Sequence, residues 1–325
     1  MNSKGGFFEL ELNENINKNY GEGLYFNSGR NAFVFYLIQK RIKNIQIPYY
    51  ICGVIPEVLN NNNIKYTFYH INEKLEIADF DSINKDVPIL VVNYFGIKNS
   101  YINQILKEKL KFIIDCSQSF FFRNSDVPSF YSPRKFFGLA DGGILMGVED
   151  DILIKQYEKL KKSFSFNDYN AQLKRIELGP EKSYIDFLKK ENKINKSKIL
   201  KMSTLTLKIY RSINTKNVIE KRKNNFNIFN KYFSDNNQLK INPENNTDFV
   251  PMIYPLLINE GGEKVRNMLI KNKIYIASYW KDVLNYEGAN DFELKMSAEL
   301  IALPIDQRFN SKEIYEIISV LKSFL

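Results

Sequence analysis

Cysteine, histidine and long apolar runs are all scarce in this chain of 325 residues. Two cysteines, Cys52 and Cys116, are too few for a disulfide framework, and neither lies in a CxxC spacing, so we expect no metal site. No apolar stretch approaches the roughly 20 residues that span a bilayer. The N-terminus has neither a long apolar segment nor a cleavage signal. We therefore expect a cytoplasmic protein without a membrane span.

The positive charge is unevenly distributed. The formal net charge is +9 at pH 7, and residues 151–240 alone contain 21 Lys and Arg against 9 Asp and Glu. Such a segment could face an anionic partner such as nucleic acid, membrane lipid or a nucleotide-linked substrate. A set of solvated helices is the simpler interpretation, because charge blocks usually mark solvated faces. No arginine-rich run or aromatic RNA motif accompanies the segment, so we expect no nucleic-acid partner.

Between about residues 28 and 148, short apolar runs alternate with helical stretches. We expect strands at 45–47, 65–69, 89–93 and 112–114, and helices at 33–42, 54–59 and 101–110. Continuous apolar strands separated by helices indicate a mostly parallel sheet that is covered on both faces. Ligands of such sheets bind beyond the carboxyl ends of the strands, where Asn93, Asp115 and the turn after Ser28 all fall. The fold class is therefore α/β.

The rest of the chain has a different pattern. Residues 151–235 indicate long basic helices, and the final part is α+β, with strands at 251–258 and 274–277 and helices at 263–272 and 311–324. The length favours two domains. We expect a large domain over 1–215, with an N-terminal arm of about residues 1–25, and a smaller C-terminal domain over 216–325.

Asp115 and Lys135 carry most of the functional information. Asp115 ends an apolar run, and Lys135 precedes the step Asp141-Gly142-Gly143. A pyridoxal phosphate enzyme needs a lysine to form a Schiff base and a carboxylate to keep the pyridine nitrogen protonated, so that the ring acts as an electron sink. Each residue alone could have a purely structural role, Lys135 as a surface lysine and Asp115 as a cap at the end of a strand. Their order on this sheet pattern favours the enzyme.

Two further segments could hold a phosphate. Residues 28–32, Ser-Gly-Arg-Asn-Ala, stand at a turn that leads into a helix, where backbone N–H groups and the positive helix end attract anions. Ser132 lies three residues before Lys135 and offers a hydroxyl group. A helix start alone binds nothing in most proteins, so this signal gains weight only together with Asp115 and Lys135.

Taken together, these motifs resemble the DegT/DnrJ/EryC1/StrS sugar aminotransferases, a group with the type I aspartate aminotransferase fold. The likeness covers roughly residues 25–148. It rests on the phosphate turn at 28–32, the aromatic stretch Pro48-Tyr49-Tyr50-Ile51-Cys52, the strand end Val91-Val92-Asn93-Tyr94-Phe95-Gly96, a D-x-x-Q motif at Asp115 and Gln118, and Lys135 before Asp141-Gly142-Gly143. Weaker echoes occur at 251–255 and 302–306.

The resemblance implies a role for each of these residues. Lys135 would bind the cofactor and move the proton, Asp115 would pair with the pyridinium nitrogen, and Gln118 would touch the phenolic oxygen. Tyr50 would stack on the ring. The cofactor-binding set is completed by residues at the phosphate, namely Gly29, Arg30, Asn31 and Ser132, with Ser129 as the competing serine. The cofactor would be pyridoxal 5'-phosphate, with pyridoxamine phosphate between the half-reactions, in a homodimer.

The chain also departs from this group. Asn93 stands where its members usually have histidine, and their Gly-x-Asn-x-Arg loop has no clear match in 195–215. The spacing from Ser132 to Lys135 is unusual for the group as well. The single histidine, His70, is not needed in this chemistry, and we expect it to be structural.

Three functions remain open from the sequence. The first is transfer of an amino group from a donor such as glutamate to a keto-sugar, in nucleotide-linked form, for surface polysaccharide or amino-sugar synthesis. The second keeps the cofactor but acts as a lyase, a dehydratase or an aminotransferase on a non-sugar carbonyl compound; the dehydratase branch replaces the lysine by histidine, so Lys135 argues against it. The third is a degenerate binding protein with a basic face.

Overall fold

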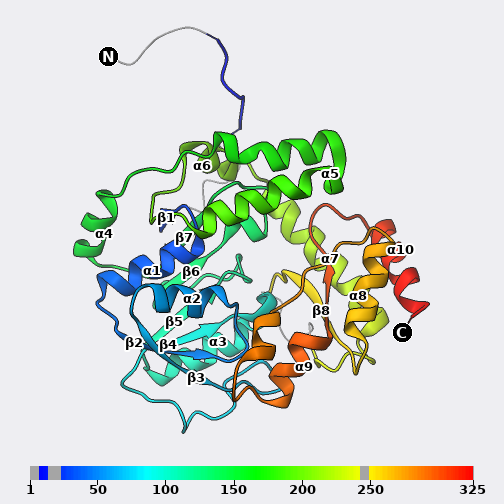
Figure 1. Ribbon diagram of the computed structural model, residues 1–325, viewed down its shortest axis with the longest axis horizontal. Coiled ribbons are helices and arrows are strands. Elements are labelled where there is room, and N and C mark those ends of the chain that lie inside the picture. Colours follow the sequence, from blue (N-terminus) through cyan, green and yellow to red (C-terminus); the bar gives the residue numbers. More distant parts are fainter. Residues whose placement is uncertain (1–6, 14–22, 242–248, 325) are drawn as a thin grey trace.

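The computed structural model describes residues 7–13, 23–241 and 249–324. It contains a seven-stranded sheet and a separate two-stranded sheet (Figure 1). In spatial order, the large sheet consists of β1 (Leu24–Phe26), β7 (Gly143–Met146), β6 (Ser129–Tyr131), β5 (Phe112–Cys116), β4 (Ile89–Val92), β2 (Asn44–Pro48) and β3 (Lys65–Tyr69). The strands from β6 to β3 are parallel, whereas β7 runs antiparallel to both β6 and β1. The predicted α/β class with a mostly parallel sheet is confirmed.

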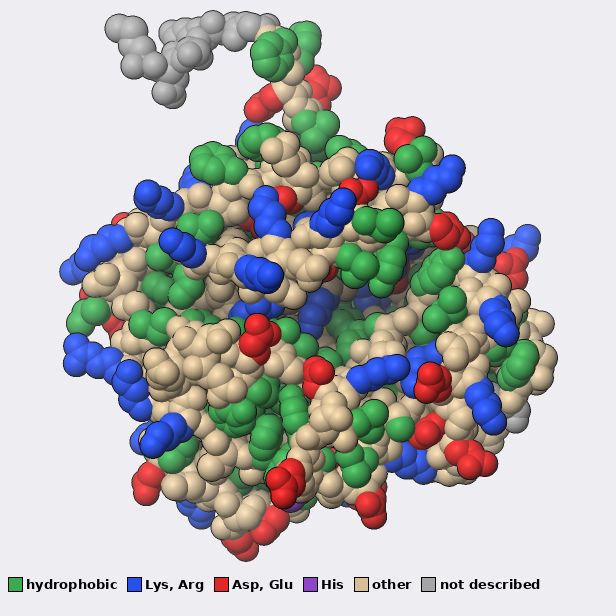
Figure 2. All heavy atoms as spheres, viewed as in Figure 1, with side chains coloured by type: hydrophobic (Ala, Val, Ile, Leu, Met, Phe, Trp, Pro, Cys, Tyr) green, Lys and Arg blue, Asp and Glu red, His purple; other side chains and the backbone are tan. Residues whose placement is uncertain are grey.

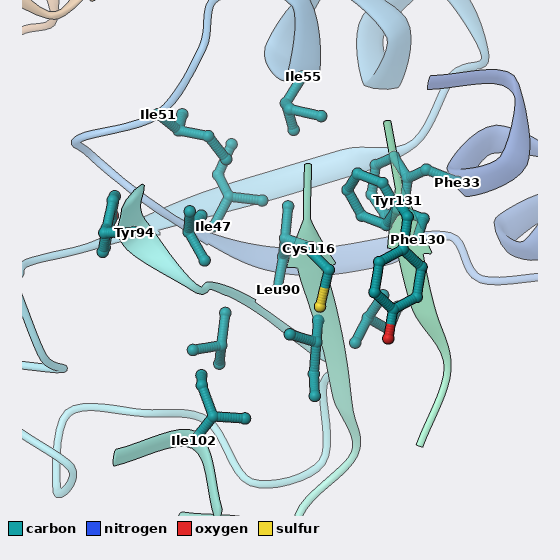
Figure 3. Packing of buried hydrophobic residues seen from close by; sticks show 14 of the residues in the cluster. Phe33, Ile47, Ile51, Ile55, Leu90, Tyr94, Ile102, Cys116, Phe130 and Tyr131 are labelled. Atoms are coloured by element: carbon teal, nitrogen blue, oxygen red, sulfur yellow. The ribbon is translucent and has the colours of Figure 1, made fainter. Parts of the chain in front are cut away.

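The centre of this sheet is buried on both faces. Every residue of β4 and β5 is buried, as continuous apolar strands of a covered parallel sheet require. Figure 3 shows Ile55 of α2 (Val54–Asn61) on one side of the strands and Ile102 of α3 (Asn99–Ile105) on the other. Ser28 caps the N-terminus of the first helix, α1 (Gly29–Gln39), because its side chain accepts a hydrogen bond from the backbone N–H of Asn31 at 3.1 Å. The sequence predicted a turn into a helix at residues 28–32, and α1 begins there.

The basic segment forms the helices that follow the large sheet. They are α4 (Asp151–Glu158), α5 (Asn170–Asn195), α6 (Thr204–Arg211) and α7 (Thr215–Phe233). In α5, Gly179 has a positive φ of 84° and Pro180 follows it, so the helix breaks there. Its two legs lie side by side (Figure 1), and Lys174 on the first bonds Asp186 on the second at 2.7 Å. Among the described residues, no helix is long and apolar enough to cross a membrane.

The C-terminal part has its own small sheet and apolar cluster. Strand β8 (Ile253–Leu257) pairs antiparallel with β9 (Leu300–Pro304), next to the helices α8 (Gly262–Lys271), α9 (Asp291–Glu299) and α10 (Ser311–Lys322). Phe226, Phe229 and Phe233 of α7 pack into this second cluster. The predicted boundary after residue 215 stays a prediction. The N-terminal arm can be judged only at 7–13 and beyond 22, because the remainder lies outside the described residues.

One expected strand was wrong. Residues 274–277 form no strand and follow α8 as an irregular segment. Their alternating pattern has a different cause, because Ile274 and Ile276 are half-buried against the second cluster while Tyr275 and Ala277 are exposed. An extended segment that packs with one face on a core produces the alternation of a strand without pairing in a sheet.

Candidate active site

Asp115 lies at the carboxyl end of β5, between Val92 of β4 and Phe130 of β6. The residue is buried, and its Oδ1 accepts a hydrogen bond from the backbone N–H of Ser117 at 2.7 Å. Burial raises the pKa of the Asp115 carboxyl above its ordinary value, while the positive charge of Lys135 and hydrogen bonds from Ser117 act in the opposite direction. A buried carboxylate of this kind gains from a cationic partner.

Lys135 ends the short 3₁₀ turn η3 (Pro133–Lys135), which begins after Ser132. Its Nζ donates a hydrogen bond to Oγ of Ser117 at 3.0 Å, and its side chain is otherwise exposed. Ser117 therefore contacts both residues, Asp115 through its backbone N–H and Lys135 through its hydroxyl group. The structure brings together the two residues that the sequence singled out, and an incoming molecule can reach the amine.

Gln118 is fully buried beside this pair. Its Oε1 accepts a hydrogen bond from the backbone N–H of Phe95, a residue with a left-handed backbone, φ 54°, after β4. Its Nε2 has no hydrogen-bond partner among the described residues. A buried donor without a partner is costly, so this N–H₂ group is available to an acceptor on a bound molecule.

Three segments meet at the start of α1. A Cβ atom on Gly29 would lie 2.9 Å from the carbonyl oxygen of Tyr131 and 3.4 Å from Cβ of Ser132. A Cβ atom on Gly143 would lie 2.1 Å from the carbonyl carbon and oxygen of Ser28. Only glycine allows the backbones to approach this closely. The helix start, Ser132 and the Gly-Gly step thus form one cradle with a positive helix end.

The competing serine, Ser129, has a different environment. It lies within β6, is fully buried, and its Oγ donates to the backbone carbonyl of Val127 at 3.1 Å. The approach of Gly29 to Ser132 puts Ser132, and not Ser129, in contact with the cradle.

Two of the sequence candidates are held by another part of the chain. Arg30 donates to the backbone oxygen and to Oδ1 of Asn195, both at 2.6 Å. Asn31 Nδ2 bonds Oδ1 of Asn27 at 2.8 Å and the backbone oxygen of Lys198 at 2.9 Å. These contacts tie α1 to the segment after α5, so both side chains have structural partners.

Tyr50, the expected stacking residue, is fully buried in an aromatic group. Its ring centroid lies 4.9 Å from that of Trp280 and 5.7 Å from that of Tyr94, and its hydroxyl group donates to the backbone oxygen of Tyr279 at 3.0 Å. The ring is thus already in contact with other aromatic rings. Asn93, at the position of the usual histidine, bonds Asn99 at 2.9 Å. His70 contacts Glu293 at 3.2 Å and stacks on Tyr49, in keeping with its expected structural role.

Sequence reasoning missed Ser117 and two glutamines. Ser117 lies inside the D-x-x-Q motif, so its place after the strand was a usable signal. Gln172 and Gln307 donate to the backbone of the turn that follows Lys135, from segments remote in sequence, and no local pattern marks them. A cavity of about 280 Å³ also exists near Leu75, Tyr101 and Leu239, but neither Asp115 nor Lys135 lines it.

Solved structures share this fold. A DegT DnrJ EryC1 StrS aminotransferase from Brucella abortus has a TM-score of 0.65 at 14% identity, over 94% of this chain and 86% of that one. The putative sugar aminotransferase Spr1654 from Streptococcus pneumoniae, in its PMP form, has a TM-score of 0.67 at 13% identity, over 93% and 87%. PseC of Helicobacter pylori, an aminotransferase involved in pseudoaminic acid biosynthesis, has a TM-score of 0.61 at 15% identity, over 94% and 87%.

Sequence comparison alone does not reach these proteins. No family model matches the chain, and no curated protein matches it. With sequence identities of only 11–15%, the likeness to solved structures shows the fold alone. The chemistry has to be inferred from the residues of this chain. The likeness to the DegT/DnrJ/EryC1/StrS sugar aminotransferases that the motifs predicted is therefore confirmed as a likeness of fold that extends over more than nine-tenths of the chain.

Proposed function

We propose that this chain is a pyridoxal phosphate-dependent aminotransferase that moves an amino group from a donor such as glutamate to a keto-sugar in nucleotide-linked form. The observation that carries the proposal is the link from Lys135 through Ser117 to Asp115, at 3.0 and 2.7 Å. A reactive amine and a buried carboxylate stand together at the carboxyl end of a parallel sheet, where such folds bind their ligands. The shared fold with sugar aminotransferases supports this substrate class.

The described residues fit the cofactor. The cradle of Ser28, Gly29 and Ser132 would hold its phosphate, and the free Nε2 group of Gln118 would donate to its phenolic oxygen. Asp115, whose pKa burial raises, would gain a positive partner in the pyridinium nitrogen. Arg30 and Asn31 would support the cradle from behind through their bonds to residues 195–198.

When bound, the cofactor supplies a ring that takes up the electron pair released as the substrate Cα loses its proton. Lys135 Nζ would hold the cofactor covalently and move that proton. Ser117 Oγ orients the amine, because it accepts a hydrogen bond from Nζ. Asp115 would pair with the pyridine nitrogen and keep it protonated, which would favour uptake of electrons by the ring.

The absorption spectrum of the purified protein tests the cofactor. After incubation with pyridoxal phosphate, the wild type should show the visible band of a lysine-bound cofactor, which glutamate should bleach. Lys135→Ala should lack the band, whereas Lys43→Ala, which removes an exposed lysine next to β2, should keep it. A wild type without the band would refute the proposal. A screen of keto-sugar nucleotides against non-sugar keto acids then identifies the acceptor.

We further propose a cytoplasmic homodimer with a large domain over 1–215 and a small domain over 216–325. The second apolar cluster around β8 and β9 supports the division. The exposed apolar side chains of α5, which include Ile176 and Ile185, support a partner surface, because large exposed patches mark interaction sites. Light scattering of the purified protein measures the mass, and a monomer that is fully active would contradict this part of the proposal.

A further inference from the structure

Two glutamines hold the turn that carries Lys135. Gln172 of α5 donates through Nε2 to the backbone oxygen of Leu139 at 3.1 Å. Gln307, which follows β9, donates through Nε2 to the backbone oxygen of Phe136 at 2.8 Å. The first leg of α5 and the segment after β9 therefore both lie against the lysine turn, although more than 130 residues separate them in sequence.

Each of these elements carries an arginine next to its glutamine. Arg175 lies three residues after Gln172, on the same face of α5. Arg308 is the residue directly after Gln307. A third arginine, Arg222 of α7, is buried below, with its guanidinium group 4.7 Å from the ring centroid of Phe136. Phe136, the residue that follows Lys135, therefore contacts the guanidinium group of Arg222.

These cations outnumber the carboxylates that face them. Asp306 accepts from Nε and Nη2 of Arg308 at 2.7 and 2.8 Å, and Glu181 accepts from the hydroxyl group of Tyr275 at 3.0 Å. Arg175 has no hydrogen bond or ion pair with another described residue. Partial burial lowers the pKa of Arg175, and Arg308 is the nearby charge that lowers it most. Two like charges that repel each other, one of them without a bonded carboxylate, favour a bound anion.

We propose that Arg175 and Arg308 bind an anionic group of the substrate beside Lys135. Arg308 uses its Nε and Nη2 edge on Asp306, which leaves Nη1 for a ligand, and Arg175 has its whole guanidinium fork available. Figure 2 shows a hollow below α5, with Lys and Arg side chains deep inside it. Guanidinium groups match the two oxygen atoms of a carboxylate or a phosphate.

The inference rests on the proposed function, in which two substrates offer this chemistry. The anion is either a carboxylate of the amino donor or a phosphate of the sugar nucleotide. Calorimetry with 2-oxoglutarate and with inorganic pyrophosphate separates the two sources. The protein is first equilibrated with pyridoxal phosphate, so that the cradle at Ser132 is filled and the probes report the second site.

The variants are Arg175→Gln and Arg308→Gln, with Lys182→Gln as the control that removes one exposed positive charge from the other leg of α5. Loss of a charge-assisted hydrogen-bond pair should weaken the affected probe by about tenfold in each arginine variant. The control should bind as the wild type does. A tenfold loss for 2-oxoglutarate identifies a carboxylate site, and a loss for pyrophosphate identifies a phosphate site.

The inference is overturned if neither probe binds the wild type, or if both arginine variants bind both probes as tightly as the control does. Circular dichroism and thermal melting check that the variants remain folded. The proposed function fails separately, because its test is the visible band of the wild type. Probe binding that depends on Arg175 and Arg308 would support the anion site even in a protein that never shows this band.

Discussion

Gly143→Ala should destroy the cradle at the start of α1. The added methyl group would stand 2.1 Å from the carbonyl carbon and oxygen of Ser28 and 2.3 Å from the backbone nitrogen of Gly29, whereas ordinary contacts begin at 3.4 Å. The backbones must separate by about 1.3 Å, because no flexible side chain can yield here. Such overpacking typically costs about 1–3 kcal/mol. A hydrogen bond of about 2.9 Å from the cradle to a bound phosphate would not survive a shift of this size.

The measurements are the melting temperature without cofactor and the dissociation constant for pyridoxal phosphate. We expect a lower melting temperature and an affinity at least about tenfold weaker, because each lost bond to a charged phosphate is worth about 1.5–3 kcal/mol. Gly138→Ala is the matched control, since a Cβ atom there meets nothing within 4 Å. If Gly143→Ala melts and binds cofactor as Gly138→Ala does, the close approach of the segments is not what shapes the site.

Four other variants test individual side chains. Burial raises the pKa of Asp115, so the folded protein holds this proton more tightly than the unfolded chain and loses stability as the pH rises above about 4. The urea midpoint of Asp115→Asn without cofactor should therefore increase relative to that of the wild type as the pH is raised from acid to neutral. The same variant should lose transamination. Glu293→Ala should lower the free energy of unfolding by about 2–4 kcal/mol, since it leaves buried N–H groups such as that of Ile71 unpaired. His70→Ala, at a half-exposed side chain, should cost less. Equal urea midpoints for these two variants would contradict this. Asn31→Ala should lower the melting temperature but leave transamination at saturating cofactor nearly unchanged. Loss of activity at an unchanged melting temperature would instead indicate that Asn31 contacts the cofactor directly.

The large sheet could be predicted because its signals are local. Ile89 to Val92 form a continuous apolar run, which a covered parallel strand requires, and Ser28 is a helix cap that acts within three residues. The position of Asp115 at a strand end follows from the same pattern. Its meeting with Lys135 was predicted from motif order, and the structure supplies the physical link through Ser117.

The remaining features depend on partners far along the chain. The short strand β6 contains only three residues and is defined by its neighbours β5 and β7. The break of α5 at Gly179 was not foreseen, although the Gly-Pro pair was a local signal. The contacts of Arg30 with Asn195 and of Gln307 with Phe136 join residues more than 160 positions apart. Sequence patterns of short range cannot report such pairs.

The site residues predicted from the sequence differ in how many of their polar groups are hydrogen-bonded within the protein. The Nδ2 group of Asn31 and the hydroxyl group of Tyr50 donate hydrogen bonds within the protein, so neither donor needs a ligand. Gln118 keeps a buried donor without a described partner, and Asp115 carries a carboxyl group whose burial is only partly offset. Folding alone would not favour the retention of these two groups, because each costs stability until a complementary molecule is bound. Their location beside an accessible lysine is what distinguishes a binding site from a structural polar cluster.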